Sequence, residues 1–103
     1  MWRQVIDMPG AYRELSATCM ITRALLIGVR KGWLNAREYQ PNVNRAWEAV
    51  KIRAAPDGKL MDVCESTGAQ KSLTDYLKRK AIMGADPRGG AMVLMLAVEM
   101  AGL

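Results

Sequence analysis

The segment Leu15–Arg30 (LSATCMITRALLIGVR) is the longest apolar-rich run in the sequence and constrains the fold most. Its apolar side chains occupy nearly every side of a helical wheel, a pattern typical of a helix buried against several neighbours. The run falls short of the ~20 residues that a membrane span needs, and Thr22 and Arg23 interrupt it. We therefore predict a core helix here, with Ser16 as its N-cap, and no membrane span.

The rest of the chain predicts further helices and one short strand. Residues 42–54 form an amphipathic helix with one wet face, preceded by a turn that Pro41 separates from it. Residues 59–64 predict a strand, and a helix runs from Ser72 to about Lys80. Residues 84–90 read as a loop, and residues 91–101 predict a second buried helix. We expect an all-α chain of αα-hairpins with one small β element.

The predicted elements are too few to bury the apolar surfaces of two of the helices. Two helices, Leu15–Arg30 and residues 91–101, are apolar on nearly every side, but one amphipathic helix and a strand are their only clear partners. Large exposed apolar patches mark interfaces. Either the chain associates with itself through these faces, or it is a segment of a larger helical barrel.

Composition excludes several function classes. The net charge is +5 over 103 residues, but the basic residues are spread singly along the chain, so we predict no nucleic-acid binding. The absence of histidine excludes histidine-based catalysis and metal ligation, and we expect neither a metal nor a cofactor. Cys19 and Cys64 lack the spacing of a redox pair, which predicts reduced thiols and a cytoplasmic protein.

Several motifs occur in a characteristic order and spacing. They are residues 2–7 (WRQVID), 14–18 (ELSAT), 28–34 (GVRKGWL), 67–68 (TG) and 86–92 (DPRGGAM). Together they resemble the C-terminal part of the unsaturated rhamnogalacturonyl hydrolases and of their unsaturated glucuronyl hydrolase relatives. The resemblance covers essentially the whole of residues 1–103. The family has glycine more often at the position of Ser66.

The resemblance implies an α/α toroid of six helical hairpins, of which this chain would supply the last few helices. It also implies hydrolysis of oligosaccharides that carry a 4,5-unsaturated uronic acid left by a polysaccharide lyase. In that family an Asp protonates the double bond and activates water, and the hydrated product collapses to release the sugar. That Asp lies upstream of the matching segment, so we expect no catalytic residue in this chain and no activity from it alone.

The same motifs suggest residues that bind the substrate. The candidates are Trp2, Gln4, Glu14, Ser16, Thr67 and Arg88. Trp2 and Gln4 suit sugar stacking and hydroxyl bonding, although a tryptophan packed under a loop explains Trp2 equally well. Glu14 and Ser16 open a helix whose N-terminus favours a uronate, but plain capping also explains them. Arg88 would bind a carboxylate, or would pair with Asp86 within its own loop.

Two function classes stay open at this point. The first is the C-terminal portion of an unsaturated-uronyl glycosyl hydrolase, which requires the missing N-terminal part and whose partner is an unsaturated oligosaccharide. The second is a non-enzymatic helical module that mediates oligomerisation or partner binding through its apolar faces.

Overall fold

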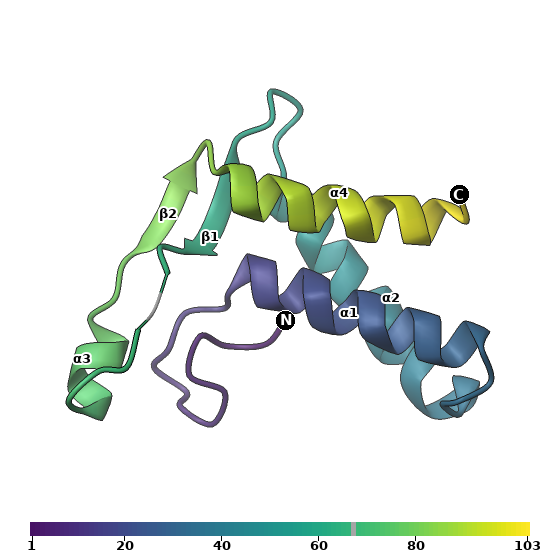
Figure 1. Ribbon diagram of the computed structural model, residues 1–103, viewed down its shortest axis with the longest axis horizontal. Coiled ribbons are helices and arrows are strands. Elements are labelled where there is room, and N and C mark those ends of the chain that lie inside the picture. Colours follow the sequence, from purple (N-terminus) through teal and green to yellow (C-terminus); the bar gives the residue numbers. More distant parts are fainter. Residues whose placement is uncertain (67) are drawn as a thin grey trace.

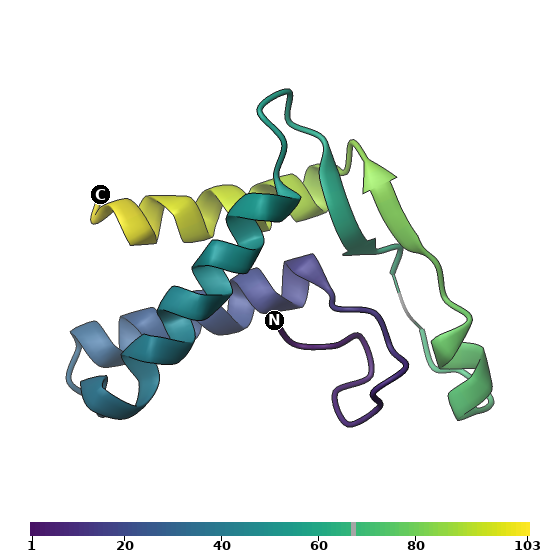
Figure 2. The ribbon, with the colours of Figure 1, turned by 180° about the vertical axis from the view of Figure 1, so that it is seen from behind.

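The computed structural model describes residues 1–66 and 68–103. Its elements, in chain order, are α1 (Leu15–Arg30), α2 (Ala36–Arg53), β1 (Leu60–Cys64), α3 (Leu73–Leu77), β2 (Ala81–Gly84) and α4 (Pro87–Ala101). Figure 1 shows α4 beside α1 and running in the same direction, with the two strands near the first turns of both helices. Figure 2 shows α2 returning across the other side of α1 as the second arm of a helical hairpin.

The predicted bounds of α1 are confirmed, but its N-cap is Glu14 rather than Ser16. The Glu14 carboxylate accepts hydrogen bonds from the backbone N–H groups of Ser16 and Ala17. A glutamate can cap in this way because its chain is long enough to fold back onto the first turn. The residues before α1 pair with one another: Trp2 and Gln4 run antiparallel to Tyr12 and Glu14, joined by backbone hydrogen bonds of 2.9 and 3.0 Å.

The α2 helix corrects the prediction that Pro41 separates a turn from the main helix, because α2 runs through Pro41. Proline lacks the N–H that would bond the Arg37 carbonyl. Arg37 and Pro41 are both exposed, so solvent can reach this carbonyl. The Asn35 side chain caps the helix at Arg37 N, and the Asn42 amide donates to the Glu38 carbonyl. These bonds stabilise the first turns of α2, although the residue before a proline disfavours the helical conformation.

The second half of the chain departs from the prediction in three places. A second strand, β2, pairs antiparallel with the predicted β1, with an irregularity between Leu60 and Val63. The α3 helix ends at Leu77 instead of about Lys80. The α4 helix begins at Pro87, inside the predicted loop, because Asp86 caps it by accepting from Gly89 N at 2.6 Å and proline suits the first helical position. The fold is therefore mostly helical, with a small two-stranded sheet.

The core lies where α1, α2, α4 and β1 meet. Its buried members are Leu15, Cys19, Val50, Leu60, Val63 and Leu96. The apolar stripe predicted on α2 is confirmed, since Val43, Ala46 and Val50 are buried.

The expectation that α4 is buried on all sides is wrong within this chain. Only Gly89 and Leu96 are buried along α4, whereas the side chain of Leu94 is 64% exposed. On α1, Met20 is 55% exposed. The radius of gyration, 14.2 Å, exceeds the ~13 Å of a compact domain of this length. The chain does not enclose its own apolar helices, as the shortage of cover predicted.

Candidate functional site

A hollow of about 290 Å³ lies at the N-terminal end of α1. Four of the predicted binding residues line it, namely Trp2, Gln4, Glu14 and Ser16. The N-terminal segment supplies one wall and the first turns of α1 another. Cys64, at the end of β1, and Tyr76, on α3, complete the lining. Residues from four separate segments therefore meet at one hollow.

Glu14 is the best-anchored residue of the hollow. Glu14 is only 3% exposed, and its carboxylate accepts hydrogen bonds from four donors. Oε1 accepts from Ser16 N at 2.9 Å, Ser16 Oγ at 2.7 Å and Cys64 N at 2.9 Å, and Oε2 accepts from Ala17 N at 2.5 Å. The carboxylate therefore ties the start of α1 to the end of β1.

This anchoring affects the predicted role of the helix terminus. The N–H groups of Ser16 and Ala17, which an anionic ligand would use, already donate to Glu14. The Ser16 hydroxyl donates to the same carboxylate. Capping thus accounts for the contacts of both Glu14 and Ser16 in the structure, and their binding of a ligand stays a prediction.

Gln4 differs from Glu14, because only one of the two polar atoms of its side-chain amide has a hydrogen-bond partner among the described residues. Its Nε2 donates to the Tyr76 carbonyl at 3.2 Å. Its Oε1 is buried and has no hydrogen-bond partner among the described residues. A buried acceptor without a donor costs free energy, so a small rotation of the amide that turns Oε1 into the hollow would be stabilised by a hydroxyl or amide donor of a bound molecule. Trp2 lies on the same wall and offers an apolar ring.

Tyr76 is a lining residue that the sequence did not single out. Its hydroxyl accepts from Gln70 N at 3.1 Å, and its carbonyl accepts from Gln4. No local sequence signal places it here, since it reaches the hollow only when α3 packs against a segment at the other end of the chain.

The last two predicted residues do not join this group. Arg88 lies on the first turn of α4 and does not line the hollow; its guanidinium is 3.6 Å from Asp86 Oδ1 and 3.5 Å from the Glu65 carbonyl oxygen. The alternative pairing with Asp86 is therefore observed. Thr67 lies outside the described residues. Its neighbour Ser66 has a φ of 95°, a conformation that suits glycine, which is the residue the family more often has there.

Two side chains close to Glu14, those of Tyr12 and Cys19, have raised pKa values. Burial, followed by the neighbouring Cys64 thiol, raises the pKa of the Tyr12 phenol. Burial also raises the pKa of the Cys19 thiol to about 12. Glu14 is the only carboxyl group among the described residues that line the hollow. Within the described part of the chain, no three Cys, Asp or Glu side chains lie close enough to hold a metal ion.

No helix among residues 1–66 and 68–103 combines the length and apolar character that crossing a membrane requires.

Solved structures resemble this chain over nearly its full length. A possible member of family GH105 from Salmonella enterica superposes with a TM-score of 0.88 at 27% identity, covering 97% of this chain and 26% of that one. A glycoside hydrolase of family 105 from C. acetobutylicum gives 0.80 at 28% identity, covering 99% and 32%. A glycosyl hydrolase of family 88 from Bacteroides vulgatus gives 0.67 at 28% identity, covering 97% and 28%.

The chain thus spans between 26% and 32% of the length of these structures. A search of curated proteins finds no match. The sequence profile of Glycosyl Hydrolase Family 88 matches residues 1–103, which confirms the resemblance noted from the motifs. The chain therefore belongs to Glycosyl Hydrolase Family 88.

Proposed function

We propose that residues 1–103 are the C-terminal portion of a hydrolase that removes a 4,5-unsaturated uronic acid from lyase-generated oligosaccharides. The observation that carries this proposal is the meeting of Trp2, Gln4, Glu14 and Ser16 at one hollow in a chain that the family profile matches throughout. A larger ring of helical hairpins would hold α1 as an inner helix and α2 as an outer one. The almost wholly apolar surface of α1 and the wet face of α2 support this arrangement.

The reaction is a hydration rather than a direct attack at the anomeric carbon. An Asp outside this chain protonates the double bond and activates water, which adds across it. The resulting hemiketal opens and releases the sugar. Gln4 Oε1 would accept from a substrate hydroxyl, and the Trp2 ring would stack on the sugar.

The proposal is tested by the ultraviolet absorbance of the unsaturated uronide, which disappears on hydration. The polypeptide that the gene encodes around residues 1–103 should remove the absorbance, whereas residues 1–103 alone should not. Activity of residues 1–103 alone would overturn the assignment of the acid to another segment. A folded longer polypeptide that leaves every unsaturated uronide intact would overturn the reaction itself.

A variant pair tests the role of Gln4. We expect Gln4→Ala to lower kcat/KM about tenfold, because the substrate hydroxyl loses its buried acceptor. Gln40→Ala is the matched control, since the Gln40 amide bonds Asn44 on α2 and lies outside the hollow. Equal rates in the two variants would remove Gln4 from the substrate-binding residues.

The alternative function is a helical module for oligomerisation or partner binding. The exposed apolar side chains of α1 and α4, among them Met20 and Leu94, favour it. This alternative requires that residues 1–103 form a discrete oligomer by themselves, which sedimentation equilibrium would detect. A cytoplasmic location is part of both proposals and is supported by the positions of Cys19 and Cys64 in the sequence, which lack the spacing of a redox pair.

A further inference from the structure

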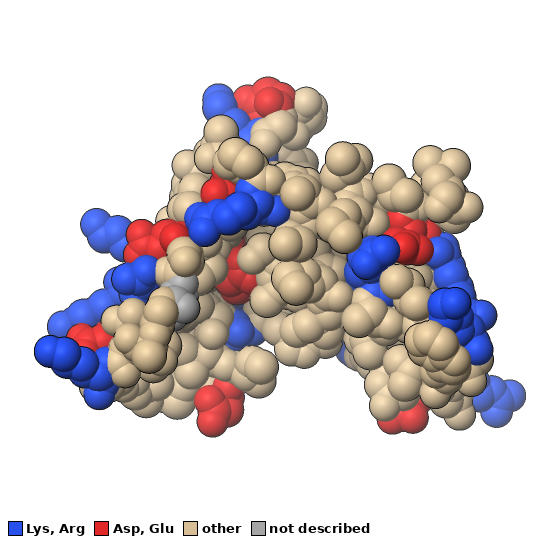
Figure 3. Space-filling view, viewed as in Figure 1, with Lys and Arg blue, Asp and Glu red and all other residues tan. Residues whose placement is uncertain are grey.

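The segment that carries α3 holds a large share of the positive charge of the chain. Residues 68–80, which we call the α3 arm, belong to the connection from β1 to β2. The arm has one acidic residue, Asp75, and four basic ones, Lys71, Lys78, Arg79 and Lys80. Figure 3 shows Lys and Arg side chains gathered over α3, at the lower left of the view. The arm is therefore a local excess of positive charge.

The lysines of the arm differ from the three lysines elsewhere in the chain. Each of those three has a partner that offsets its charge, namely Glu48 for Lys51, Asp57 for Lys59 and the Trp33 ring for Lys31. The three lysines of the arm are exposed, and their ammonium groups form neither an ion pair nor a hydrogen bond with any described residue. Capping of α3 does not account for the set, because Lys71 precedes the N-cap Ser72, where a positive charge opposes the helix dipole. These charges can therefore bind a ligand.

Contacts through Tyr76 place the arm at the rim of the hollow at the start of α1. The Tyr76 carbonyl accepts from Gln4 Nε2 at 3.2 Å, and its hydroxyl accepts from Gln70 N at 3.1 Å. Tyr76 itself lines the hollow. The Arg79 guanidinium lies 3.5 Å from Glu65 Oε1, so the arm is also held to the residue that follows β1. The three lysines therefore lie within five positions of a residue that lines the hollow.

Arg3 adds a positive charge to the lining of the hollow itself. Its Nη1 donates to the Ala11 carbonyl at 2.8 Å, and no carboxylate of the described residues pairs with it. The carboxylate of Glu14, which also lines the hollow, already accepts from four donors. The hollow and the arm together therefore favour a ligand that carries negative charge.

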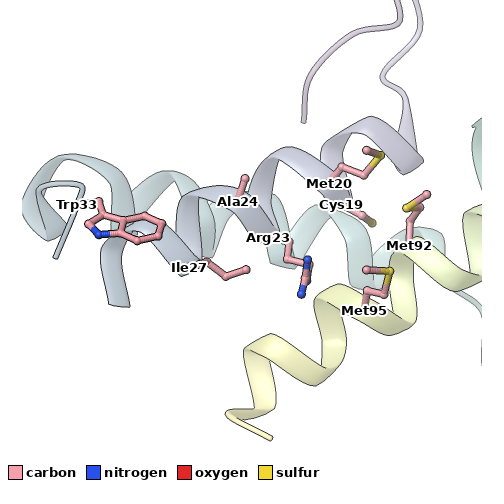
Figure 4. Close-up of a pocket in the computed structure, with 8 residues that line it drawn as sticks. All are labelled: Cys19, Met20, Arg23, Ala24, Ile27, Trp33, Met92 and Met95. Carbon is pink, nitrogen blue, oxygen red and sulfur yellow. The ribbon is translucent and has the colours of Figure 1, made fainter. Parts of the chain in front are cut away.

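The groove between α1 and α4 has the opposite character (Figure 4). Its volume is about 470 Å³, and Met20, Ala24 and Met95 are among the apolar residues that line it. Arg23 is the charged residue of this lining, and its Nη2 already pairs with Glu99 Oε1 at 2.9 Å. A charged sugar would lose its hydration in such a groove without a compensating partner, so the hollow beside the arm suits it better.

We propose that Arg3 and the lysines of the α3 arm bind a second acidic group of the oligosaccharide. This group is a carboxylate or a sulfate ester on a sugar beyond the terminal uronic acid. Ammonium and guanidinium groups form charge-assisted hydrogen bonds with both. The inference rests on the proposed function, since it concerns the substrate of the same site, and it predicts that acidic oligosaccharides bind more tightly than neutral ones of the same length.

The test is the affinity of the polypeptide that the gene encodes around residues 1–103 for three disaccharides, measured by isothermal titration calorimetry. Each begins with a uronic acid whose double bond has been reduced, so that no hydration occurs during the titration. The second sugar is N-acetylgalactosamine, its 6-sulfate or galacturonic acid.

We expect at least one acidic second sugar to bind about tenfold more tightly than the neutral one at low salt, and the difference to shrink at about 0.5 M salt. The disaccharide that binds more tightly tells sulfate from carboxylate. Equal affinities for all three, or no binding of any, would overturn the inference.

Two triple variants with the same change in net charge test the arm. The arm variant combines Lys71→Gln, Lys78→Gln and Lys80→Gln, and the control combines Lys31→Gln, Lys51→Gln and Lys59→Gln. The arm variant should reduce the preference for the acidic disaccharide at least about fivefold, and the control should change it less than about twofold.

Two results of this comparison would overturn the inference. Equal effects of the two triple variants would trace the preference to net charge rather than to the arm. A short DNA duplex that binds more tightly than either acidic disaccharide, and that depends on the same three lysines, would assign the arm to nucleic acid.

A further set of variants tests Arg3. Arg3→Gln should weaken binding of the preferred acidic disaccharide about tenfold and that of the neutral one less than about twofold. Arg3→Lys keeps the positive charge and should recover most of the preference, and Arg37→Gln, on the exposed first turn of α2, is the matched control. Equal losses for the acidic and the neutral disaccharide would show that Arg3 acts only through its bond to Ala11, and would overturn its role in binding.

Hydration of unsaturated uronides separates this inference from the proposed function. A polypeptide that hydrates them but binds acidic and neutral disaccharides equally overturns the present inference alone. A polypeptide that prefers the acidic disaccharides through the arm but hydrates no unsaturated uronide overturns the proposed reaction alone.

Discussion

At its N-terminal end α1 is enclosed by this chain, whereas the side that it shares with α4 farther along is open. At the enclosed end, the Glu14 carboxylate has four donors, and Leu15 and Cys19 are fully buried. On the open side, Met20 and Ala24 are exposed. One helix therefore has a side that the chain itself encloses and a side that stays exposed.

The difference shows how burial is divided along an apolar helix. The sequence of α1 is apolar on nearly all sides, so its pattern alone does not tell which side the chain itself covers. The side covered here faces α2, β1 and Leu96 of α4, while Met20 and Ala24 lie on a side that stays exposed. Stability of the isolated chain should therefore depend on the first region and hardly at all on the second.

The largest expected effect breaks the enclosed end. Glu14→Ala removes the acceptor of the Ser16, Ala17 and Cys64 N–H groups, and should lower the free energy of unfolding by about 3 to 5 kcal/mol. Urea unfolding followed by circular dichroism measures this loss. Glu38→Ala, on the exposed first turn of α2, is the control and should cost less than about 0.5 kcal/mol. A loss for Glu14→Ala as small as the control would contradict the role of the carboxylate.

The next pair sharpens the comparison on α4. Leu96 is 0% exposed and packs in the core, so Leu96→Ala should cost about 3 kcal/mol in residues 1–103. Leu94→Ala, two residues earlier, should lower the free energy of unfolding by less than about 0.5 kcal/mol, because the Leu94 side chain is exposed to water. Thermal unfolding of the two variants compares them, and similar losses would show that the outer side of α4 is covered in solution.

The smallest expected effect concerns the contact of α4 with the sheet. A Cβ at Gly89 would lie 3.0 Å from Leu60 Cδ1 and from Val63 Cγ2, so Gly89→Ala should cost about 1 to 2 kcal/mol. A Cβ at Gly90 would meet nothing within 4 Å, and Gly90→Ala should gain about 0.5 to 1 kcal/mol from helix propensity. Urea unfolding measures both changes: the midpoint should fall for Gly89→Ala and rise for Gly90→Ala. A stabilising Gly89→Ala would show that α4 can move away from β1.

The sequence predicts the elements whose signals are local. The bounds of α1 follow from its apolar run, and the buried stripe of α2 follows from its spacing. The errors arise where distant contacts or neighbouring side chains decide. The strand β2 is four residues long and forms by pairing with β1, and the helix through Pro41 is held by Asn35 and Asn42.

The candidate site divides in the same way. Motif order identifies Trp2, Gln4, Glu14 and Ser16, which the fold does bring together. It does not identify Tyr76, because the bond from Gln4 to the Tyr76 carbonyl joins residues 72 positions apart. It also does not show that the donors of Ser16 and Ala17 are taken by Glu14, since this depends on how one side chain folds back.

The bond between Cys64 N and Glu14 joins residues 50 positions apart and has a consequence for synthesis on the ribosome. The polypeptide leaves the ribosome from its N-terminal end, so α1 and α2 emerge from the exit tunnel before residue 64 does. Until then the carboxylate lacks one of its donors and must keep water around it. The N-terminal end of α1 is therefore less firmly held in the nascent protein. When β1 emerges, Cys64 N replaces the water on the Glu14 carboxylate and fixes this end of the helix.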